Sequence, residues 1–149
     1  MLNLSKEVKV TRVMDAVAAG KNDTQEGTVL DMAGFDGVVF IAALGTLTAT
    51  AITDLRAQQG KLADGSDMAD LEGTKVSLVA GTDDNKLAVL DVYRPQERYV
   101  QCNIVRATED AVIDGVIALQ YKGRKAPVTH DPTTVAGAEL HVSPDEGTA

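Results

Sequence analysis

The chain has 149 residues, enough for one domain with a buried core, and its 44% hydrophobic and 24% charged residues are ordinary for a globular protein. Its 22 acidic and 14 basic residues give a net charge of −8, which argues against coating nucleic acid or anchoring electrostatically to an anionic membrane. The single cysteine excludes an internal disulfide framework and a cysteine-based zinc cluster.

The beginning of the chain carries no apolar stretch of signal-peptide length. The longest apolar run, from Val38 to Leu44, is far shorter than the roughly 20 residues that a membrane helix needs. We therefore expect a protein without a leader or a membrane anchor, made in the cytoplasm.

Apolar residues recur with a period of two along most of the chain, which predicts strands separated by turns. The predicted strands cover residues 8–13, 28–32, 38–44, 46–55, 74–80, 86–93, 99–106 and 111–121. The continuous apolar run Val38–Leu44 is typical of a strand buried on both faces, and Gly115 indicates a bulge in the last strand. Residues 66–71 have the composition of one helical turn capped by Ser66.

Strand signals at intervals of roughly 8–12 residues, with almost no helical period, predict an all-β antiparallel β-sandwich or jelly roll. The expected organisation is an N-terminal arm (1–7), a sandwich body (8–125) and an extended C-terminal arm (126–149). Both arms carry apolar side chains, which fits docking to a partner or a neighbouring copy and equally fits arms folded back on their own body. These side chains are Leu2, Leu4, Val128, Val135, Leu140 and Val142.

The residues that most often carry chemistry have simple structural interpretations here. Cys102 lies on the apolar side of its strand, as a small buried hydrophobe would, and His130-Asp131 is interpreted as a solvated loop pair. His141 also lies in the C-terminal arm. The acidic residues of one loop lack the EF-hand spacing and predict a solvated loop: Asp64, Asp67, Asp70 and Glu72. We expect no catalytic residue, no cofactor, no metal and no enzymatic activity.

Two groups of basic residues keep several interpretations open. The cluster Lys122-Gly123-Arg124-Lys125 is a solvated strand end, a nucleic-acid contact or a contact to an acidic partner, and the net charge favours the first. Arg94, Arg98 and Tyr99 lie beside Pro95 at the start of a strand. Either the arginines are solvated while Tyr99 packs at the edge of the sandwich, or their guanidinium forks contact acidic groups of a partner.

Three stretches, in this order, resemble the jelly-roll capsid cement (decoration) proteins of tailed bacteriophages. Residues 31–45 resemble the family pattern D-x-x-G-[FY]-D-x-[VL]-x-F followed by an apolar strand that ends in Gly. Residues 92–100 are similar to its Y-R-x…[KR]-R-Y-[VL]-[RQ] segment, and residues 117–127 are similar to its closing strand, basic turn and proline. The resemblance spans roughly residues 28–128.

The resemblance implies a structural virion protein on the exterior of an icosahedral capsid, assembled in the host cytoplasm, which cements neighbouring capsomers against the pressure of packaged DNA. It implies the major capsid protein as partner and a homo-oligomer, with a dimer favoured over a trimer, and neither nucleic acid nor membrane as partner. The candidate partner-interface residues are Leu2, Leu4, Arg94, Arg98, Tyr99, Arg124, Lys125, Val128, Leu140 and Val142.

Two other functions remain open from the sequence. A tail or head–tail connector component of a phage would have the same features at a lower copy number. A jelly-roll ligand-binding module or enzyme belongs to a different class, and it would need a cluster of polar or metal-binding side chains on one face of the sandwich. The sequence shows no such cluster, and only 3% of its residues are aromatic.

Overall fold

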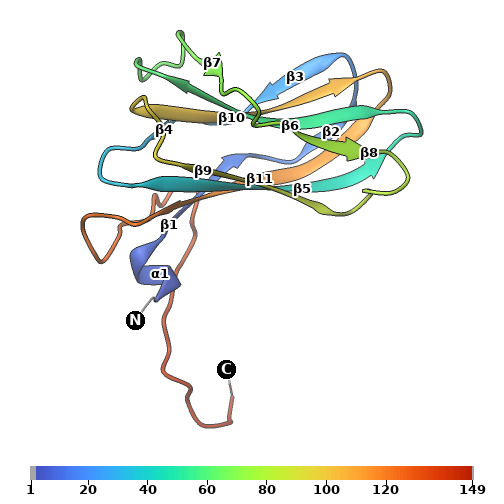
Figure 1. Cartoon of the computed structure of the whole chain (residues 1–149). Coiled ribbons are helices and arrows are strands. Elements are labelled where there is room, and N and C mark those ends of the chain that lie inside the picture. Colours follow the sequence, from blue (N-terminus) through green and yellow to red (C-terminus); the bar gives the residue numbers. More distant parts are fainter. Residues whose placement is uncertain (1–2, 149) are drawn as a thin grey trace.

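The computed structural model describes residues 3–148 and is built almost entirely of β-strands (Figure 1). Its helix, α1 (Leu4–Glu7), is a single turn. Among the described residues, no helix has the length and apolar character needed to cross a membrane. The strands are β1 (Lys9–Met14), β2 (Val17–Gly20), β3 (Asp23–Glu26), β4 (Leu30–Asp31), β5 (Gly37–Leu47), β6 (Ile52–Gly60), β7 (Ala69–Asp70), β8 (Val76–Val79), β9 (Leu87–Tyr93), β10 (Tyr99–Ala107) and β11 (Ala111–Tyr121).

The strands form two antiparallel sheets that pack face to face (Figure 1). Sheet A has the order β1-β11-β5-β9, with β2 also paired to β11. Sheet B has the order β3-β10-β6-β7, with β4 also paired to β10 and β8 to β6. The pairs β1–β11, β3/β4–β10, β5–β9 and β6–β8 are nested in the chain, which is the winding of a jelly roll. The predicted antiparallel sandwich is therefore confirmed.

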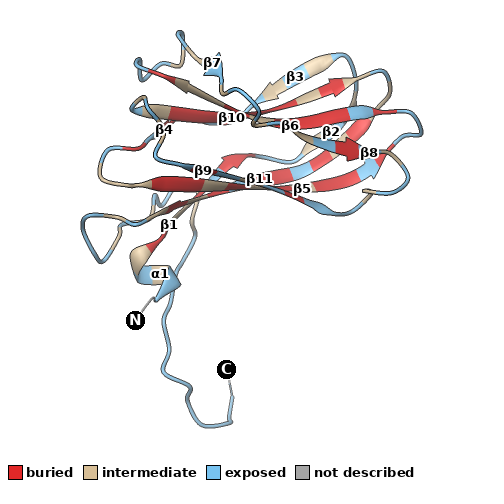
Figure 2. Ribbon diagram, in the orientation of Figure 1, coloured by how far each residue is buried: buried red, intermediate tan, exposed pale blue. Residues whose placement is uncertain are grey.

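The core lies between the sheets and is built from alternate residues of each strand (Figure 2). On β10, the predicted apolar side is buried completely, because Val100, Cys102 and Ile104 point at sheet A. On β5, the prediction of burial on both faces is wrong. Between Val38 and Leu44 the even-numbered residues are buried, whereas Val39, Ile41 and Ala43 lie on the outer surface of sheet A and are only half-buried.

The last strand carries the predicted bulge at Gly115. The pairing of β11 with β5 shifts register between Ile113 and Gly115. Gly115 has a φ of +142°, a conformation that is essentially restricted to glycine. A Cβ atom there would approach the Met14 carbonyl oxygen to 3.2 Å, so backbone conformation and close packing both require glycine.

Several local predictions differ from the structure. Strand β5 continues through Gly45, and the chain turns at Thr48–Ala51, where Thr50 has a φ of +70°. The expected single strand 46–55 is therefore divided between two sheets. The helical turn predicted at Ser66 does not form, because Asp64 Oδ1 accepts both the N–H and the Oγ–H of Ser66 and the following residues enter β7.

The first part of the C-terminal arm folds back on the body. The Val128 N–H donates to the Lys6 carbonyl at 2.8 Å, and His130 Nδ1 accepts the Val10 N–H at 3.2 Å. Since Nδ1 accepts, Nε2 carries the proton and donates to the Ser5 carbonyl at 3.0 Å. His130 therefore fastens the arm to the N-terminal segment, and its interpretation as a solvated pair with Asp131 is wrong. Residues 137–148 then extend away from the body (Figure 1).

Candidate functional site

The three stretches that carry the family resemblance meet at one end of the sandwich. The Arg98 guanidinium donates to both carboxylate oxygens of Asp31, at 2.9 and 2.8 Å. The Arg94 N–H donates to the Asp36 carbonyl at 2.7 Å, and the Arg124 N–H donates to the Gly34 carbonyl at 2.8 Å. The sequence motifs therefore correspond to loops that hold one another in place.

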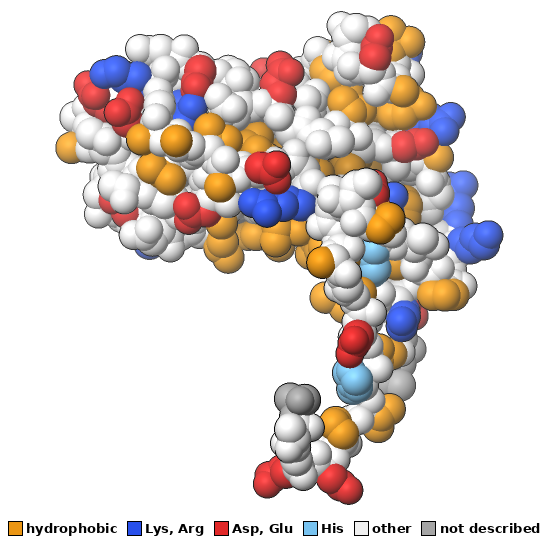
Figure 3. Space-filling view, turned by 180° about the vertical axis from the view of Figure 1, so that it is seen from behind, with side chains coloured by type: hydrophobic (Ala, Val, Ile, Leu, Met, Phe, Trp, Pro, Cys, Tyr) orange, Lys and Arg blue, Asp and Glu red, His pale blue; other side chains and the backbone are white. Residues whose placement is uncertain are grey.

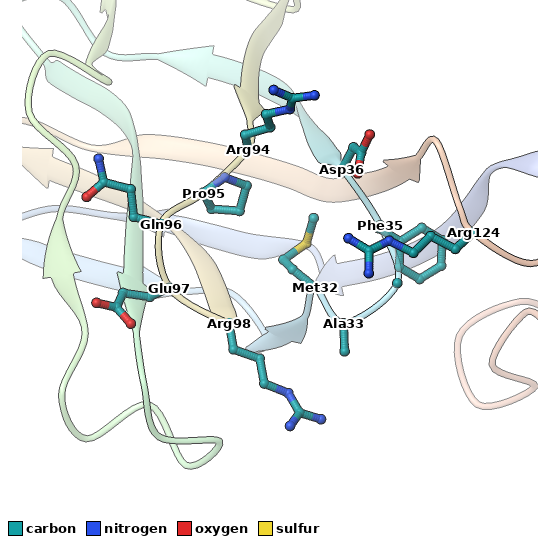
Figure 4. Close-up of a pocket in the computed structure, with 11 residues that line it drawn as sticks. Met32, Ala33, Phe35, Asp36, Arg94, Pro95, Gln96, Glu97, Arg98 and Arg124 are labelled. Carbon is teal, nitrogen blue, oxygen red and sulfur yellow. The ribbon is translucent and has the colours of Figure 1, made fainter.

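Between these loops lies a pocket of about 600 Å³, which we call the arginine pocket (Figure 4). Its lining consists of Met32–Asp36, Arg94–Arg98 and Arg124. In Figure 4, Met32 and Pro95 lie at the centre, Arg94 lies above them, and the Arg98 side chain points away. Asp36 and Glu97 share the lining with the arginines, so the pocket presents charges of both signs.

The predicted arginines differ in their availability to a partner. The fork of Arg98 is occupied by Asp31, and this hydrogen-bonded pair lowers the pKa of the Asp31 carboxyl and raises that of Arg98. Within residues 3–148, Arg94 and Arg124 form no ion pair, although Arg94 lies 5.1 Å from the centre of the Tyr93 ring. Tyr99 is half-buried, with the Arg98 guanidinium 5.3 Å from its ring centre, as expected for a tyrosine at the sandwich edge.

A second surface was not predicted: the outer side of sheet A is apolar across four neighbouring strands. In its middle row, Ile117 of β11 lies opposite Ile41 of β5, which lies opposite Val89 of β9. Val89 is 55% exposed, and Figure 3 shows hydrophobic side chains along this side of the body. We call this surface the apolar face; it comprises Val10, Val39, Ile41, Ala43, Leu87, Val89, Ile117 and Leu119.

Aromatic side chains close one end of the apolar face. Tyr93 and Tyr121 stack with their ring centres 6.5 Å apart on either side of Gly37, where a Cβ atom would collide with the Tyr121 ring. The Tyr121 hydroxyl donates to Asp91 Oδ1 at 2.6 Å, and burial together with this carboxylate raises the pKa of the hydroxyl. The one acidic side chain in the outward rows of β9 is thus hydrogen-bonded within the face.

The outer side of sheet B has the opposite chemistry. Asp54 is nearly buried there and pairs with Arg56 at 3.1 Å and with Lys75 at 3.2 Å. Burial acts to raise the pKa of Asp54, but hydrogen bonds from Ser77, Arg56 and Lys75 outweigh it and lower the pKa. The outer side of sheet B is therefore mainly polar, although Ile52 and Val79 are exposed on it, and the outer side of sheet A is mainly apolar.

Both arms lie on the side of the apolar face (Figures 1 and 3). A groove of about 580 Å³, which we call the α1 groove, runs between α1 and sheet A. It is lined by Leu4, Glu7, Val8, Val39, Leu119, Tyr121, Lys122, Gly123 and Ala126. A neighbouring hollow contains Val135 of the C-terminal arm beside Val10 and Ile117.

The predicted arm residues have different environments. Leu4 lines the α1 groove, and Val128 is half-buried and tied to Lys6. Leu140 and Val142 are exposed, Val142 to 94%. Leu2 lies outside the described residues. In the basic cluster, Lys122 lines the α1 groove, and Arg124 lines the arginine pocket. Arg124 and Lys125 are exposed and lie in the loop that follows β11.

The acidic loop and the cysteine have local structural roles. Asp67 accepts the N–H groups of Lys61 and Leu62, which lower its pKa, and Asp70 accepts the amide of Gln58. Within residues 3–148, no three metal-ligating side chains lie together. Burial raises the pKa of the Cys102 thiol to about 12, which makes it unreactive at neutral pH.

Comparison of the chain with models of known protein families gives no match, and comparison with curated protein sequences gives none either. The assignment of a function therefore depends on the residues and surfaces described above. A sequence signal for the apolar face does exist: the continuous run Val38–Leu44 requires an apolar residue at every second outward position. The same run is also typical of a strand buried on both faces, so the sequence alone does not distinguish an exposed apolar face from a covered one.

Proposed function

We propose that this protein is a structural virion protein that binds the outer surface of an icosahedral phage capsid and cements neighbouring capsomers. The observation that carries the proposal is the one-sidedness of the molecule. The apolar face and both arms lie on one side of the body, whereas the opposite side carries the ion-paired Asp54 and is mainly polar. The sequence resemblance to capsid cement proteins supports the same function.

The one-sided arrangement suits a protein laid on a larger surface. A contiguous exposed apolar patch commonly marks an interaction site, since its burial removes apolar area from water. The polar side, with Asp54 paired to Arg56 and Lys75, remains suited to solvent. The net charge of −8 favours the outside of a shell whose interior is filled with a polyanion.

The apolar face alone is small for a stable interface. Four strands at a spacing of about 4.8 Å and five residues along β5, from Val39 to Ala43, at about 3.4 Å each give a flat area of about 330 Å². A standard interface buries about 800 Å² on each partner. The arms extend from the same side and enlarge the contact, and several such contacts joined in one molecule gain by effective concentration. This combination favours bridging between capsomers.

The proposal is tested by counting the chain in purified virions of the phage that encodes it. Mild dissociation followed by quantitative mass spectrometry should give copies in proportion to the major capsid protein, because each equivalent capsomer junction offers the same site. Particles stripped of the chain should rupture at lower temperature or lower osmotic shock than particles to which it is added back. A handful of copies per particle would contradict the cement function and would indicate a tail or connector component.

A further inference from the structure

The end of the C-terminal arm has the character of a strand without a partner. Residues 138–142 alternate small or apolar side chains with polar ones, and the Glu139 and His141 side chains meet at 2.8 Å on one side of the extended chain. Leu140 and Val142 are exposed on the arm. Apart from the Glu139–His141 contact, residues 136–148 make no hydrogen bond to any other described residue.

The arm is also acidic at its end. Residues 138–148 contain Glu139, Asp145 and Glu146 and no lysine or arginine. An extended chain rises about 3.3–3.6 Å per residue, so the segment from Leu140 to Glu146 spans about 20 Å. The segment therefore presents two aliphatic side chains, Leu140 and Val142, and three residues later two carboxylates, Asp145 and Glu146.

The α1 groove has the complementary features. Its walls are mainly apolar, from Leu4 and Val8 on one side to Val39 and Leu119 on the other, and Glu7 is its acidic residue. Lys122 lies on its rim, and the adjacent Arg124 and Lys125 are exposed. Among the described residues, none of these three cations forms an ion pair. The groove volume of about 580 Å³ lies in the range of roughly 300–1,000 Å³ that is typical of binding sites.

We infer that residues 138–146 of one copy bind in the α1 groove of a second copy, and that the two copies exchange these segments reciprocally. Leu140 and Val142 enter the apolar part of the groove, while Asp145 and Glu146 meet the loop of Lys122, Arg124 and Lys125. A second copy is the occupant because each molecule carries both the segment and the groove, on the same side of the body. A two-fold dimer therefore forms the segment–groove contact twice. In its own copy the segment leaves the body (Figure 1).

Charge exchange between two full-length variants tests the pairing. The first variant carries Asp145→Lys and Glu146→Lys, and the second carries Arg124→Glu and Lys125→Glu. Each variant alone opposes like charges and should be monomeric in sedimentation equilibrium at concentrations where the wild type is dimeric. An equimolar mixture places opposite charges at both contacts and should form dimers again, as should the chain with all four changes. Circular dichroism and thermal unfolding check that every variant is folded.

The apolar part of the contact has its own variants. Leu140→Ser with Val142→Ser should weaken dimerisation, whereas Val79→Ser, at an exposed aliphatic position on sheet B, should leave it unchanged. A wild-type chain that is monomeric at about 1 mM overturns the inference, because a dissociation constant above that value is too weak for a specific pair. Failure of the equimolar mixture to form dimers also overturns it, because the mixture offers opposite charges at both exchanged contacts.

The pairing can be tested separately from binding to a capsid, although Val39 and Leu119 belong to both the α1 groove and the apolar face. If the chain forms exchanged dimers but is absent from virions, the proposed function fails and the pairing stands. If the chain saturates capsids as a monomer, the pairing fails and the proposed function stands.

Discussion

Arg106 is the buried charged residue on which the most contacts converge. Its side chain is 3% exposed and donates to both carboxylate oxygens of Asp23, at 2.7 and 2.5 Å, and to the carbonyls of Ala18 and Ala111, each at 2.8 Å. These partners belong to β3, β2 and β11, so one guanidinium joins the edges of both sheets. The planar guanidinium suits this site because it satisfies several acceptors at fixed angles.

Replacing Arg106 should therefore destabilise the protein strongly. Arg106→Met removes the partner of Asp23 and the guanidinium donor of two carbonyls, and we expect a loss of about 3 kcal/mol in the free energy of unfolding. Urea unfolding at neutral pH measures it. Arg12→Met is the control, because Arg12 is exposed and pairs only with the exposed Asp15. Equal stability of both variants would contradict the prediction.

The same pair predicts the direction of a pH dependence. The hydrogen bonds from Arg106 lower the pKa of Asp23 in the folded state. The stabilisation is complete above the unfolded pKa of about 3.9 and is lost as the pH falls through the lower folded pKa. Arg106→Met should therefore lose less stability than the wild type on acidification below about pH 4. Parallel acid-unfolding curves for the two proteins would contradict this.

The burial of a single residue could be predicted from the sequence where it depends only on alternation along the residue's own strand. Cys102 is buried as expected, because alternation along β10 puts it on the apolar side. Arg106 ends the same strand, and its burial depends on Asp23, which lies 83 residues earlier in the chain. His130 was misjudged for the same reason, since its partners are Ser5 and Val10. Long-range polar contacts leave no periodic signal in the sequence.

At the scale of elements, the bulge in β11 is a point of strict sequence requirement. Gly115→Ala should cost about 1–3 kcal/mol in the free energy of unfolding, because an alanine at φ +142° is strained and its Cβ meets the Met14 carbonyl. Gly73→Ala is the matched control: Gly73 has a φ of +77° but open space around it, so its substitution should cost less. Thermal or urea unfolding compares the two, and a larger loss for Gly73→Ala would contradict the prediction.

The long strands could be predicted from alternation, but their ends and the short strands could not. Gly45 was expected to end β5, whereas the strand continues to Leu47, which pairs with Ala111 of β11 beyond the bulge. Strands β2 and β3 were missed because four polar or small residues carry too little pattern. Their pairing partners, β11 and β10, hold them in place through backbone hydrogen bonds that any sequence can make.

At the scale of the whole molecule, the apolar face should be required for binding and dispensable for folding. Val89→Lys should reduce the occupancy of capsids stripped of the chain, while its free energy of unfolding stays within about 0.5 kcal/mol of the wild type. Val79→Lys changes an equally exposed valine on sheet B, which faces the other way, and should bind as the wild type does. Loss of occupancy in both variants would contradict docking through the apolar face.

The sequence allowed the fold class to be predicted, but it did not reveal the apolar outer side of sheet A. The side on which each strand exposes its apolar residues depends on strand order, and strand order requires pairings such as β1 with β11, more than 100 residues apart. The three motif stretches that carry the family resemblance lie close together in the structure. Their contacts, such as Asp31 with Arg98, show that they shape one end of the sandwich.

The position of the chain ends has a practical consequence for peptide display. Both ends of the described chain emerge on the side of the apolar face (Figure 1), so a tag or cargo fused there would be trapped beneath the body when that side is docked. The hairpin between β6 and β7 emerges on the opposite side, and most of its residues from Lys61 to Asp67 are exposed. If the protein docks on a capsid as proposed, an epitope inserted in that hairpin would point outward and remain accessible to antibodies.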